Sequence, residues 1–371
     1  MRVMFFIVFP ILVLCAMSYV LWHAWLILPF GKVVKWLAMI VMAACFLSMF
    51  FFLGGKLDRM PLDAASVCYD VGTSSIIILL YLFLIFLFSD LLRLVHLLPS
   101  RLLHDSWTGT LSLVALLLVI FIGGNIQYRH KVRVPLTLTT DKHLGKDYKI
   151  VFVSDLHLGY HNRRSELARW IDLVNAENPD MVLIAGDIID ISVRPLLEEH
   201  MAEEFHRVKA PIYACLGNHE YYSSQPRAKE FYQDAGIHLL IDEKAVVDSA
   251  ITIIGRDDRT NPGRHTLAEL AVTQTDSTYT ILLDHQPYEL EKTEASHIDF
   301  QFSGHTHRGQ VWPISWITDA VYECSFGPWQ RGSTHYYISS GLGIWGGKFR
   351  IGTQSEYIVA TLREAGQAIH V

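Results

Sequence analysis

Long apolar runs dominate the first third of this chain. Four of them, at residues 3–28, 33–53, 71–92 and 108–124, approach or exceed the roughly 20 residues that a helix needs to cross a bilayer. Tryptophans stand near their ends, as is typical of membrane–water interfaces: Trp22, Trp25, Trp36 and Trp107. The pattern predicts an all-α membrane region of about four transmembrane helices within residues 1–125.

The first run has a secretory signal peptide as its alternative. However, it is longer than the apolar part of such a peptide, lacks a convincing cleavage site, and is followed by three more runs. Four spans would place both ends of this region on one side of the bilayer. The basic residues on that side would be Arg2, Lys56, Arg59, Arg129, Lys131 and Arg133, against Lys32, Lys35, Arg93 and Arg101 on the other. This excess favours a cytoplasmic catalytic domain.

The pattern changes after residue 125. Residues 126–147 are polar and basic, which predicts a linker followed by an edge strand at 133–139. Within residues 148–371, strand-like apolar runs at 149–154, 181–185, 211–216, 279–283 and 298–302 alternate with helix-like segments. One such segment, 165–178, has its apolar residues at helical spacing. Alternation of this kind predicts an α/β catalytic domain over 148–371.

Composition excludes several classes of protein. The net charge is −6 and no cluster of Lys and Arg stands out, which argues against a nucleic-acid partner. The five cysteines show no paired spacing, so we expect neither a disulfide framework nor a thiolate metal site. The predicted spans also lack paired charges or broken helices, which argues against a transporter.

Residues with metal-ligand chemistry follow the predicted strands. They form five short blocks: Asp155-Leu-His157, Gly186-Asp187, Gly217-Asn218-His219-Glu220, His285, and Gly304-His305-Thr306-His307. Carboxylate, imidazole and amide ligands without thiolate suit Mn, Fe or Zn. The candidates are about twice what one tetrahedral ion needs. We therefore expect two divalent metal ions that share one bridging ligand.

The spacing suggests a role for each block. Asp155 and His157 are two apart in a segment expected to be extended, so both side chains can point toward one ion. Gly186 permits a sharp turn that projects Asp187, whose two carboxylate oxygens can bridge two cations. His219 directly follows Asn218 and is better placed as a donor to phosphoryl oxygens or as the acid for the leaving group. Glu220 is the candidate to orient His219.

The ordered set D-x-H, GD, GNH-E, H, GHxH resembles that of the calcineurin-like metallophosphoesterases. Gln310 and Gly341-Leu342-Gly343 resemble the membrane-associated bacterial branch of this family. The resemblance implies a four-layer sandwich of two mixed β-sheets flanked by helices, and a location in the bacterial inner membrane. It assigns the first metal to Asp155, His157, Asp187 and His307, the second to Asp187, Asn218, His285 and His305, and transition-state donation to His219.

One residue departs from the pattern of this branch. Arg308 stands where relatives often have a small residue, and it either binds substrate phosphate or faces solvent. Asn218 and His219 are the other expected substrate contacts. Downstream, the aromatic residues between Trp312 and Trp345 predict either a packed sheet or an apolar rim that contacts the bilayer or an acyl chain.

These observations predict a membrane-anchored dinuclear phosphoesterase. Its substrate would contain a phosphodiester or pyrophosphate bond, and the resemblance permits a lipid-linked one such as a UDP-acylglucosamine. One alternative is a general or cyclic-nucleotide phosphodiesterase. An alternative of another class is a membrane sensor that binds metal without turnover, although neither Asp187 nor His219 is lost here.

Overall fold

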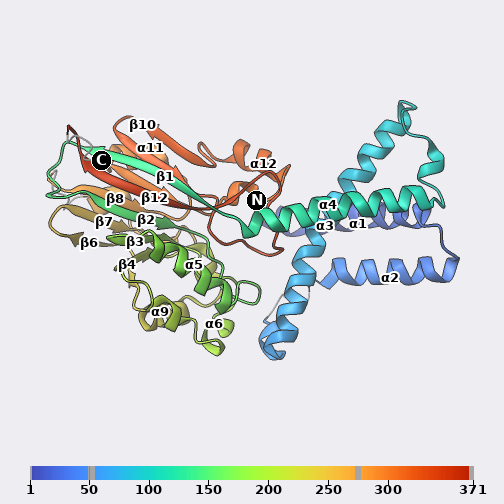
Figure 1. Ribbon diagram of the computed structural model, residues 1–371, viewed down its shortest axis with the longest axis horizontal. Helices are drawn as coiled ribbons and strands as arrows, with labels where there is room; N and C mark the ends of the chain where they lie inside the picture. Colours follow the sequence, from blue (N-terminus) through green and yellow to red (C-terminus); the bar gives the residue numbers. More distant parts are fainter. Residues whose placement is uncertain (1, 49, 51–54, 272–276, 367–371) are drawn as a thin grey trace. The chain divides into compact units, whose positions relative to one another are not determined.

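The computed structural model describes residues 2–48, 50, 55–271 and 277–366. The chain divides into two compact units (Figure 1). The first contains residues 1–125 together with Gly346–Lys348, and the second contains Ile126–Trp345 and Phe349–Val371. We refer to them as the helical unit and the catalytic unit.

The helical unit contains long apolar helices. Its helices are α1 (Arg2–Ile27), α2 (Lys32–Ser48), η2 (Leu57–Arg59), α3 (Leu62–Leu94), η3 (Ser100–Leu102) and α4 (Trp107–Arg129). Val20, Phe46, Leu79, Leu82 and Phe86 form its buried core. Many other apolar side chains of these helices are exposed, as expected of helices that face lipid.

Three helices in the described part of the chain are long and apolar enough to cross a membrane, one fewer than the sequence predicted. They are residues 10–27 of α1, all of α3 and all of α4. The predicted second span, 33–53, corresponds to α2, which ends at Ser48 after 17 residues; residues 49 and 51–53 of that span lie outside the described residues. Four spans would place both ends of the helical region on the same side of the bilayer, and that argument depends on an even number of spans. The side on which the catalytic unit lies therefore no longer follows from the number of spans.

Two polar residues of the apolar helices lie together inside the helical unit. The Asp90 carboxylate accepts a hydrogen bond from the Tyr19 hydroxyl at 2.7 Å and lies 3.0 Å from His23 Nε2. His23 is buried, and its ring stacks on Phe86. A polar side chain on an apolar helix needs such a partner, because an unpaired polar group in an apolar environment is costly.

The catalytic unit contains, within the described residues, two six-stranded sheets. The first has the order β1 (Lys131–Thr140), β12 (Ser355–Glu364), β2 (Tyr148–Val153), β3 (Met181–Ala185), β4 (Ile212–Cys215) and β5 (His238–Leu239). The second has the order β10 (Gly327–Arg331), β11 (Thr334–Ile338), β9 (Phe300–Ser303), β8 (Tyr279–Leu283), β7 (Ile251–Gly255) and β6 (Glu243–Val247). Both sheets are mixed, with parallel central strands.

Helices cover the outer faces of the two sheets. They are α5 (Arg164–Ala176), α6 (Arg194–Glu198), α7 (Ala202–Phe205) and α9 (Gln225–Asp234) on the first sheet, and α10 (Leu267–Ala271) and α11 (Leu290–Ala295) on the second. The short helices α8 (Asn218–Tyr222), η4 (His307–Gly309) and α12 (Ile314–Val321) lie in the segments that follow β4 and β9. In β2, Ile150 and Phe152 pack between the sheets, whereas Val151 and Val153 pack against α5. This alternation follows from the two-residue period of a strand. The result is the four-layer sandwich of two mixed sheets flanked by helices that the sequence predicted.

The segment that joins the predicted spans to the catalytic strands is short. Where the sequence predicted a linker from residue 126, α4 continues to Arg129 and β1 begins at Lys131. β1 lies at the edge of the first sheet and pairs with β12 over its whole length, from Lys131 opposite Ser355 to Thr140 opposite Glu364. Only one residue therefore separates an apolar helix from the catalytic sheet.

Candidate metal centre

The predicted ligands lie in loops that begin directly after buried strands. Asp155, Asp187, His285 and His305 each stand two residues beyond the end of β2, β3, β8 and β9, respectively. Parallel strands bring such loops together at one edge of a sheet. Five of the seven predicted ligands have a positive φ, a conformation uncommon for residues other than glycine and concentrated at functional sites: Asp155, His157, Asp187, His305 and His307.

This backbone geometry corrects one premise. Asp155 and His157 were expected to point the same way because their segment would be extended, but their φ angles are +54° and +45°. The two side chains converge because the chain turns at both residues. At Gly186, φ is +74°, and a Cβ there would lie 2.7 Å from the Gly217 nitrogen, so glycine is needed next to Asp187.

One group of side chains consists of Asp155, His157 and His307. The two Nε2 atoms of His157 and His307 are 3.0 Å apart, and Asp155 Oδ1 lies 3.5 Å from His307 Nε2. Asp155 and His157 are fully buried. Burial and the neighbouring His157 hold the pKa of His307 well below its usual range, so its ring is neutral and its lone pair is available.

A second group consists of Asp187, Asn218, His285 and His305. Asp187 Oδ2 lies 3.1 Å from His285 Nε2, and Asn218 Oδ1 lies 3.2 Å from the same nitrogen. One ligand atom from each of Asp187, His285 and His305 lies within 4.8 Å of the others. Asp187 Oδ2 is also 3.7 Å from His157 Nε2, which places this carboxylate between the two groups.

The donor set fits a pair of divalent cations. His285 Nδ1 lies 2.8 Å from the Ala185 carbonyl oxygen, which requires a proton on Nδ1 and makes Nε2, 3.1 Å from Asp187 Oδ2, the nitrogen that would bind a cation. Buried His307 Nδ1 has no hydrogen-bond partner in the structure. Several lone pairs thus converge in a buried space, and this arrangement is stabilised when positive charge lies among them.

His219 lies at the edge of these groups and is oriented by Asp190. Its Nδ1 is 3.1 Å from the Asp190 carbonyl oxygen and 3.3 Å from Asp190 Oδ1, and its side chain is 12% exposed. Burial lowers the pKa of His219, but the charges of Asp187 and Asp190 outweigh this and raise it to about 9. With Nδ1 engaged, Nε2 is the atom that remains to donate to a substrate.

The prediction that Glu220 orients His219 was wrong. The Glu220 carboxylate instead accepts hydrogen bonds from the backbone N–H groups of Gly217, Asp187 and Ile189 and from the Tyr232 hydroxyl, at 2.7–3.1 Å. Glu220 therefore ties the loop after β3 to the loop after β4. A carboxylate near the first helical turn serves unpaired N–H groups in this way.

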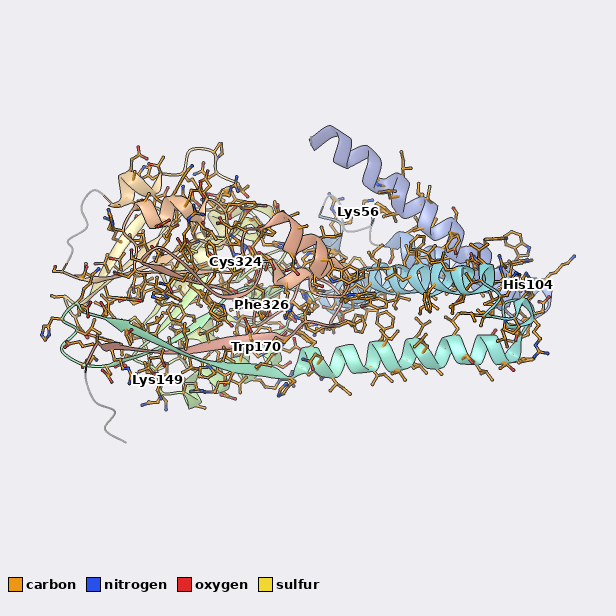
Figure 2. All side chains as sticks on the ribbon, turned by 90° about the horizontal axis from the view of Figure 1, so that it is seen from above. Lys56, His104, Lys149, Trp170, Cys324 and Phe326 are labelled. Carbon is orange, nitrogen blue, oxygen red and sulfur yellow. The ribbon has the colours of Figure 1, made fainter. Side chains whose placement is uncertain are left out.

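The structure also places Arg308 and a separate pocket. The Arg308 guanidinium lies 4.5 Å from the centre of the Phe326 ring, which Figure 2 labels, and among the described residues no carboxylate lies within ion-pair distance of it.

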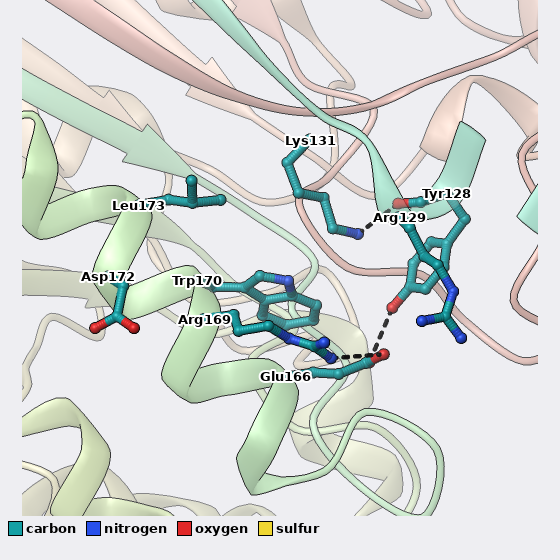
Figure 3. A pocket seen from close by; sticks show the side chains of 8 residues that line it. All are labelled: Tyr128, Arg129, Lys131, Glu166, Arg169, Trp170, Asp172 and Leu173. Atoms are coloured by element: carbon teal, nitrogen blue, oxygen red, sulfur yellow. Dashed lines mark hydrogen bonds and ion pairs between the residues drawn. The ribbon is translucent and has the colours of Figure 1, made fainter. Parts of the chain in front are cut away.

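A hollow of about 460 Å³ elsewhere in the catalytic unit contains none of the predicted ligands (Figure 3). Its lining includes the cationic side chains of Arg129, Lys131 and Arg169.

Sequence reasoning missed Arg350. Its guanidinium is fully buried and donates hydrogen bonds to the carbonyl oxygens of His307 and Gly343 and to Ser355 Oγ, at 2.8, 3.0 and 3.2 Å. Burial lowers the pKa of Arg350 to about 10. No motif marks this residue, because its partners are backbone atoms distant in the sequence. Arg350 holds the loop that carries His307 against the Gly341–Gly343 turn.

Replacement of Arg350 by methionine is therefore expected to destabilise the catalytic unit. Buried carbonyl groups would lose their donor, which costs about 3 kcal/mol in total at 1–3 kcal/mol per unpaired group. The melting temperature of the detergent-solubilised chain should fall by roughly 6–12 °C. Arg227→Met, at an exposed position of α9, is the control and should leave it unchanged. Equal melting temperatures for both variants would contradict this role.

Comparison with known proteins agrees with this geometry. The sequence profile of the calcineurin-like phosphoesterases matches residues 148–309. The metallophosphoesterase YkuE of Bacillus subtilis is 32% identical over 272 residues, which cover 65% of this chain and 91% of YkuE. The chain belongs to the calcineurin-like phosphoesterase family. This is the family that the five sequence blocks indicated, and its members are dinuclear metal-dependent enzymes.

Other relatives match a smaller share of this chain. The metallophosphoesterase Cj0846 of Campylobacter jejuni is 32% identical over 228 residues, which cover 59% of this chain and 60% of that protein's length. A zebrafish (Danio rerio) transmembrane protein with a metallophosphoesterase domain is 32% identical over 236 residues, or 58% of this chain and 53% of its own. Together with the three apolar helices, this relative indicates membrane association.

Among solved structures, the 5'-nucleotidase precursor of Thermus thermophilus aligns over 58% of this chain and 54% of its own. The sequence identity is 16% and the TM-score is 0.36.

Proposed function

We propose that this protein is a membrane-anchored, dinuclear metal-dependent phosphoesterase that hydrolyses a phosphodiester or pyrophosphate bond of a lipid-linked substrate. The observation that carries the proposal is the position of Asp187 between the two groups of candidate ligands. Asp155, His157 and His307 would hold one divalent ion, Asn218, His285 and His305 the other, and Asp187 would contact both. The ions would be Mn, Fe or Zn, which accept this nitrogen and oxygen ligand set.

The bound ions and the side chains around them would have different roles in the reaction. When bound, the two ions supply charge neutralisation for the phosphoryl group and an activated water. His219 Nε2 donates a proton or a hydrogen bond to the substrate, and Asp190 holds the ring in the orientation that this requires. His219 and His305 are the partly exposed members of the site, which makes their side the entrance for the substrate. Tyr222 and Tyr322 lie beside these two histidines at this entrance.

The membrane side of the proposal rests on the helical unit. A chain whose apolar helix α4 passes into a catalytic strand after one residue keeps its catalytic unit at the bilayer surface. The basic residues at this junction, Arg129, Lys131 and Arg133, favour the cytoplasmic side of a bacterial inner membrane. A phosphoester carried by a lipid is the substrate class that such an anchored enzyme meets most often.

The test is a reconstitution assay on the full chain. Metal-stripped protein receives Mn, Fe or Zn and is offered a UDP-linked glycolipid, a water-soluble chromogenic diester, or a cyclic nucleotide. We expect turnover to require added metal and to be greater on the glycolipid. Turnover of the soluble substrates alone would replace the lipid-linked substrate by a general or cyclic-nucleotide phosphodiester. Two bound ions without turnover on any substrate would support a sensor instead.

A further inference from the structure

Helix α12 presents its apolar side chains away from the domain core. Trp316, Ile317 and Val321 are 64%, 61% and 58% exposed, whereas Ser315 is buried. With 3.6 residues per turn, these three apolar residues share one half of the helix with Ile314 and Ala320, and the polar residues occupy the other half. A surface helix of a soluble domain has the opposite polarity, with its apolar face toward the core.

The polar half of α12 carries its one buried residue, Ser315. Beyond the end of the helix, the Ser325 hydroxyl donates a hydrogen bond to the Asp319 carboxylate of the same half. On the exposed side, Trp312 is 42% exposed and its ring contacts that of Trp316 edge to face at 5.3 Å. Of the aromatic residues downstream, Tyr336 and Tyr337 of β11 are buried in the sheet, whereas Trp345 is 43% exposed. α12 and Trp312 together form one exposed apolar patch.

The register of the first sheet places the metal centre at the end where the chain leaves its last apolar helix. β1 begins at Lys131, opposite Ser355, the first residue of the parallel strand β12. β12 is antiparallel to β2, with Ile358 opposite Phe152, so the carboxyl end of β2 lies at this same end. The loop that carries Asp155 follows directly. The candidate ligands thus lie at the end of the sheet where β1 begins.

The start of α12 lies at this end as well. The Trp312 N–H donates to the Ile351 carbonyl oxygen at 2.7 Å, and Val311 forms a β-bridge with Ile351. Ile351 precedes Ser355 by four residues, which span at most about 14 Å. Two strand-to-strand distances of about 5 Å are added to this length, one from Lys131 to Ser355 and one from Ile351 to Trp312. Trp312 therefore lies no more than about 25 Å from Lys131. α4 ends at Arg129, two residues before Lys131.

We propose that α12 is an interfacial helix whose apolar face, Ile314, Trp316, Ile317 and Val321, inserts together with the preceding Trp312 into the lipid leaflet in which the chain is anchored. The occupant is a bilayer because the same chain supplies apolar helices that require one, and α4 delivers it to this end of the domain. Paired tryptophans on an apolar helix face suit the headgroup boundary. The cations Arg129, Lys131 and Arg169 near the exit suit anionic headgroups. Inserted in this way, α12 holds the metal centre at the level of lipid phosphates.

The first test measures insertion without reference to activity. The full chain, with Cys15, Cys45, Cys68 and Cys324 replaced by serine, is placed in nanodiscs of phosphatidylethanolamine and phosphatidylglycerol. An environment-sensitive fluorophore is attached to Ile317→Cys or, as the control, to Val246→Cys. Val246 is equally exposed but lies on the edge strand β6. We expect a blue-shifted emission that is quenched by nitroxide-labelled lipid at position 317, and neither effect at 246. Equal exposure of both labels to water would overturn the proposal.

The second test measures the consequence for catalysis, and it rests on the proposed function. The double variant Trp316→Ser with Ile317→Ser should lower the rate on a phosphodiester anchored in the same nanodiscs by at least about tenfold, because docking raises the local substrate concentration. Its rate on a water-soluble diester should stay that of the wild type, as should both rates of Val246→Ser. An equal loss on both substrates would overturn the docking role. If the label at position 317 is buried in lipid but the wild type turns over neither substrate, the phosphoesterase assignment would be contradicted. The insertion of α12 would still be supported.

Discussion

Replacement of Asp187 by asparagine is expected to abolish most turnover and to reduce the bound metal below two ions per chain. Asn keeps the size of the side chain but removes the negative charge that lies between the two ligand groups, 3.1 Å from His285 Nε2 and 3.7 Å from His157 Nε2. Loss of a group that merely orients a metal ligand costs 10–100-fold in affinity or activity, so a shared ligand should cost at least about 100-fold. Metal analysis and the rate on a diester measure both effects.

A matched control separates the loss of a metal ligand from the loss of a hydrogen-bonded, half-buried carboxylate. Asp299 accepts a hydrogen bond from Lys142 Nζ at 2.6 Å and another from the backbone of Thr280 at 2.7 Å, away from the site. Asp299→Asn should lower the melting temperature slightly while two ions and the wild-type rate remain. If Asp187→Asn also kept two ions and the wild-type rate, Asp187 would not be the shared ligand.

Replacement of His219 by alanine is expected to lower turnover by about 10²–10⁴-fold, the usual contribution of a positioned proton donor. The bound metal should stay at two ions per chain, because His219 Nδ1 is engaged by Asp190 and its side chain stands at the edge of the ligand groups. The measurement is the single-turnover rate of metal-loaded protein. His335→Ala, at an exposed position of β11, serves as the control and should behave as the wild type.

The leaving group distinguishes the two roles of His219. If the imidazole protonates the departing oxygen, the loss in His219→Ala should be much greater with an alkyl leaving group than with p-nitrophenol, which departs without a proton. If the imidazole instead stabilises the phosphoryl oxygens, both substrates should lose activity equally. A wild-type rate with both substrates would remove His219 from the mechanism.

The catalytic blocks could be found in the sequence because each is a local feature. A buried strand has a continuous apolar run, and the residues that follow its last position are a few letters away, as at Ala185 and Asp187. The strands predicted at 181–185 and 279–283 have those bounds in the structure, and the other predicted strands agree to within one or two residues. Membrane spans were predicted less accurately, because α2 ends at Ser48 after 17 residues, fewer than the roughly 20 that cross a bilayer.

Interactions across long sequence separations could not be predicted in the same way. The contact between His157 and His307 joins residues 150 positions apart, and the bonds of Arg350 end on backbone atoms that have no sequence signature. Proximity in the sequence was misleading for Glu220, which adjoins His219 but turns toward the loop after β3, while Asp190 from another loop reaches the ring. Side-chain direction at a turn depends on φ and ψ, which the surrounding packing determines.

The sequence by itself determined the family, the types of ligand and the apolar helices, because these depend on residue identity and on periodicity over a few residues. Only the tertiary structure decided which ligands converge, which carboxylate orients His219, and which side of α12 faces outward. Those features depend on strand register and on packing between distant segments. In particular, the pairing of Lys131 with Ser355 and of Ile358 with Phe152 brings the end of α4, the metal centre and α12 to one end of the sheet.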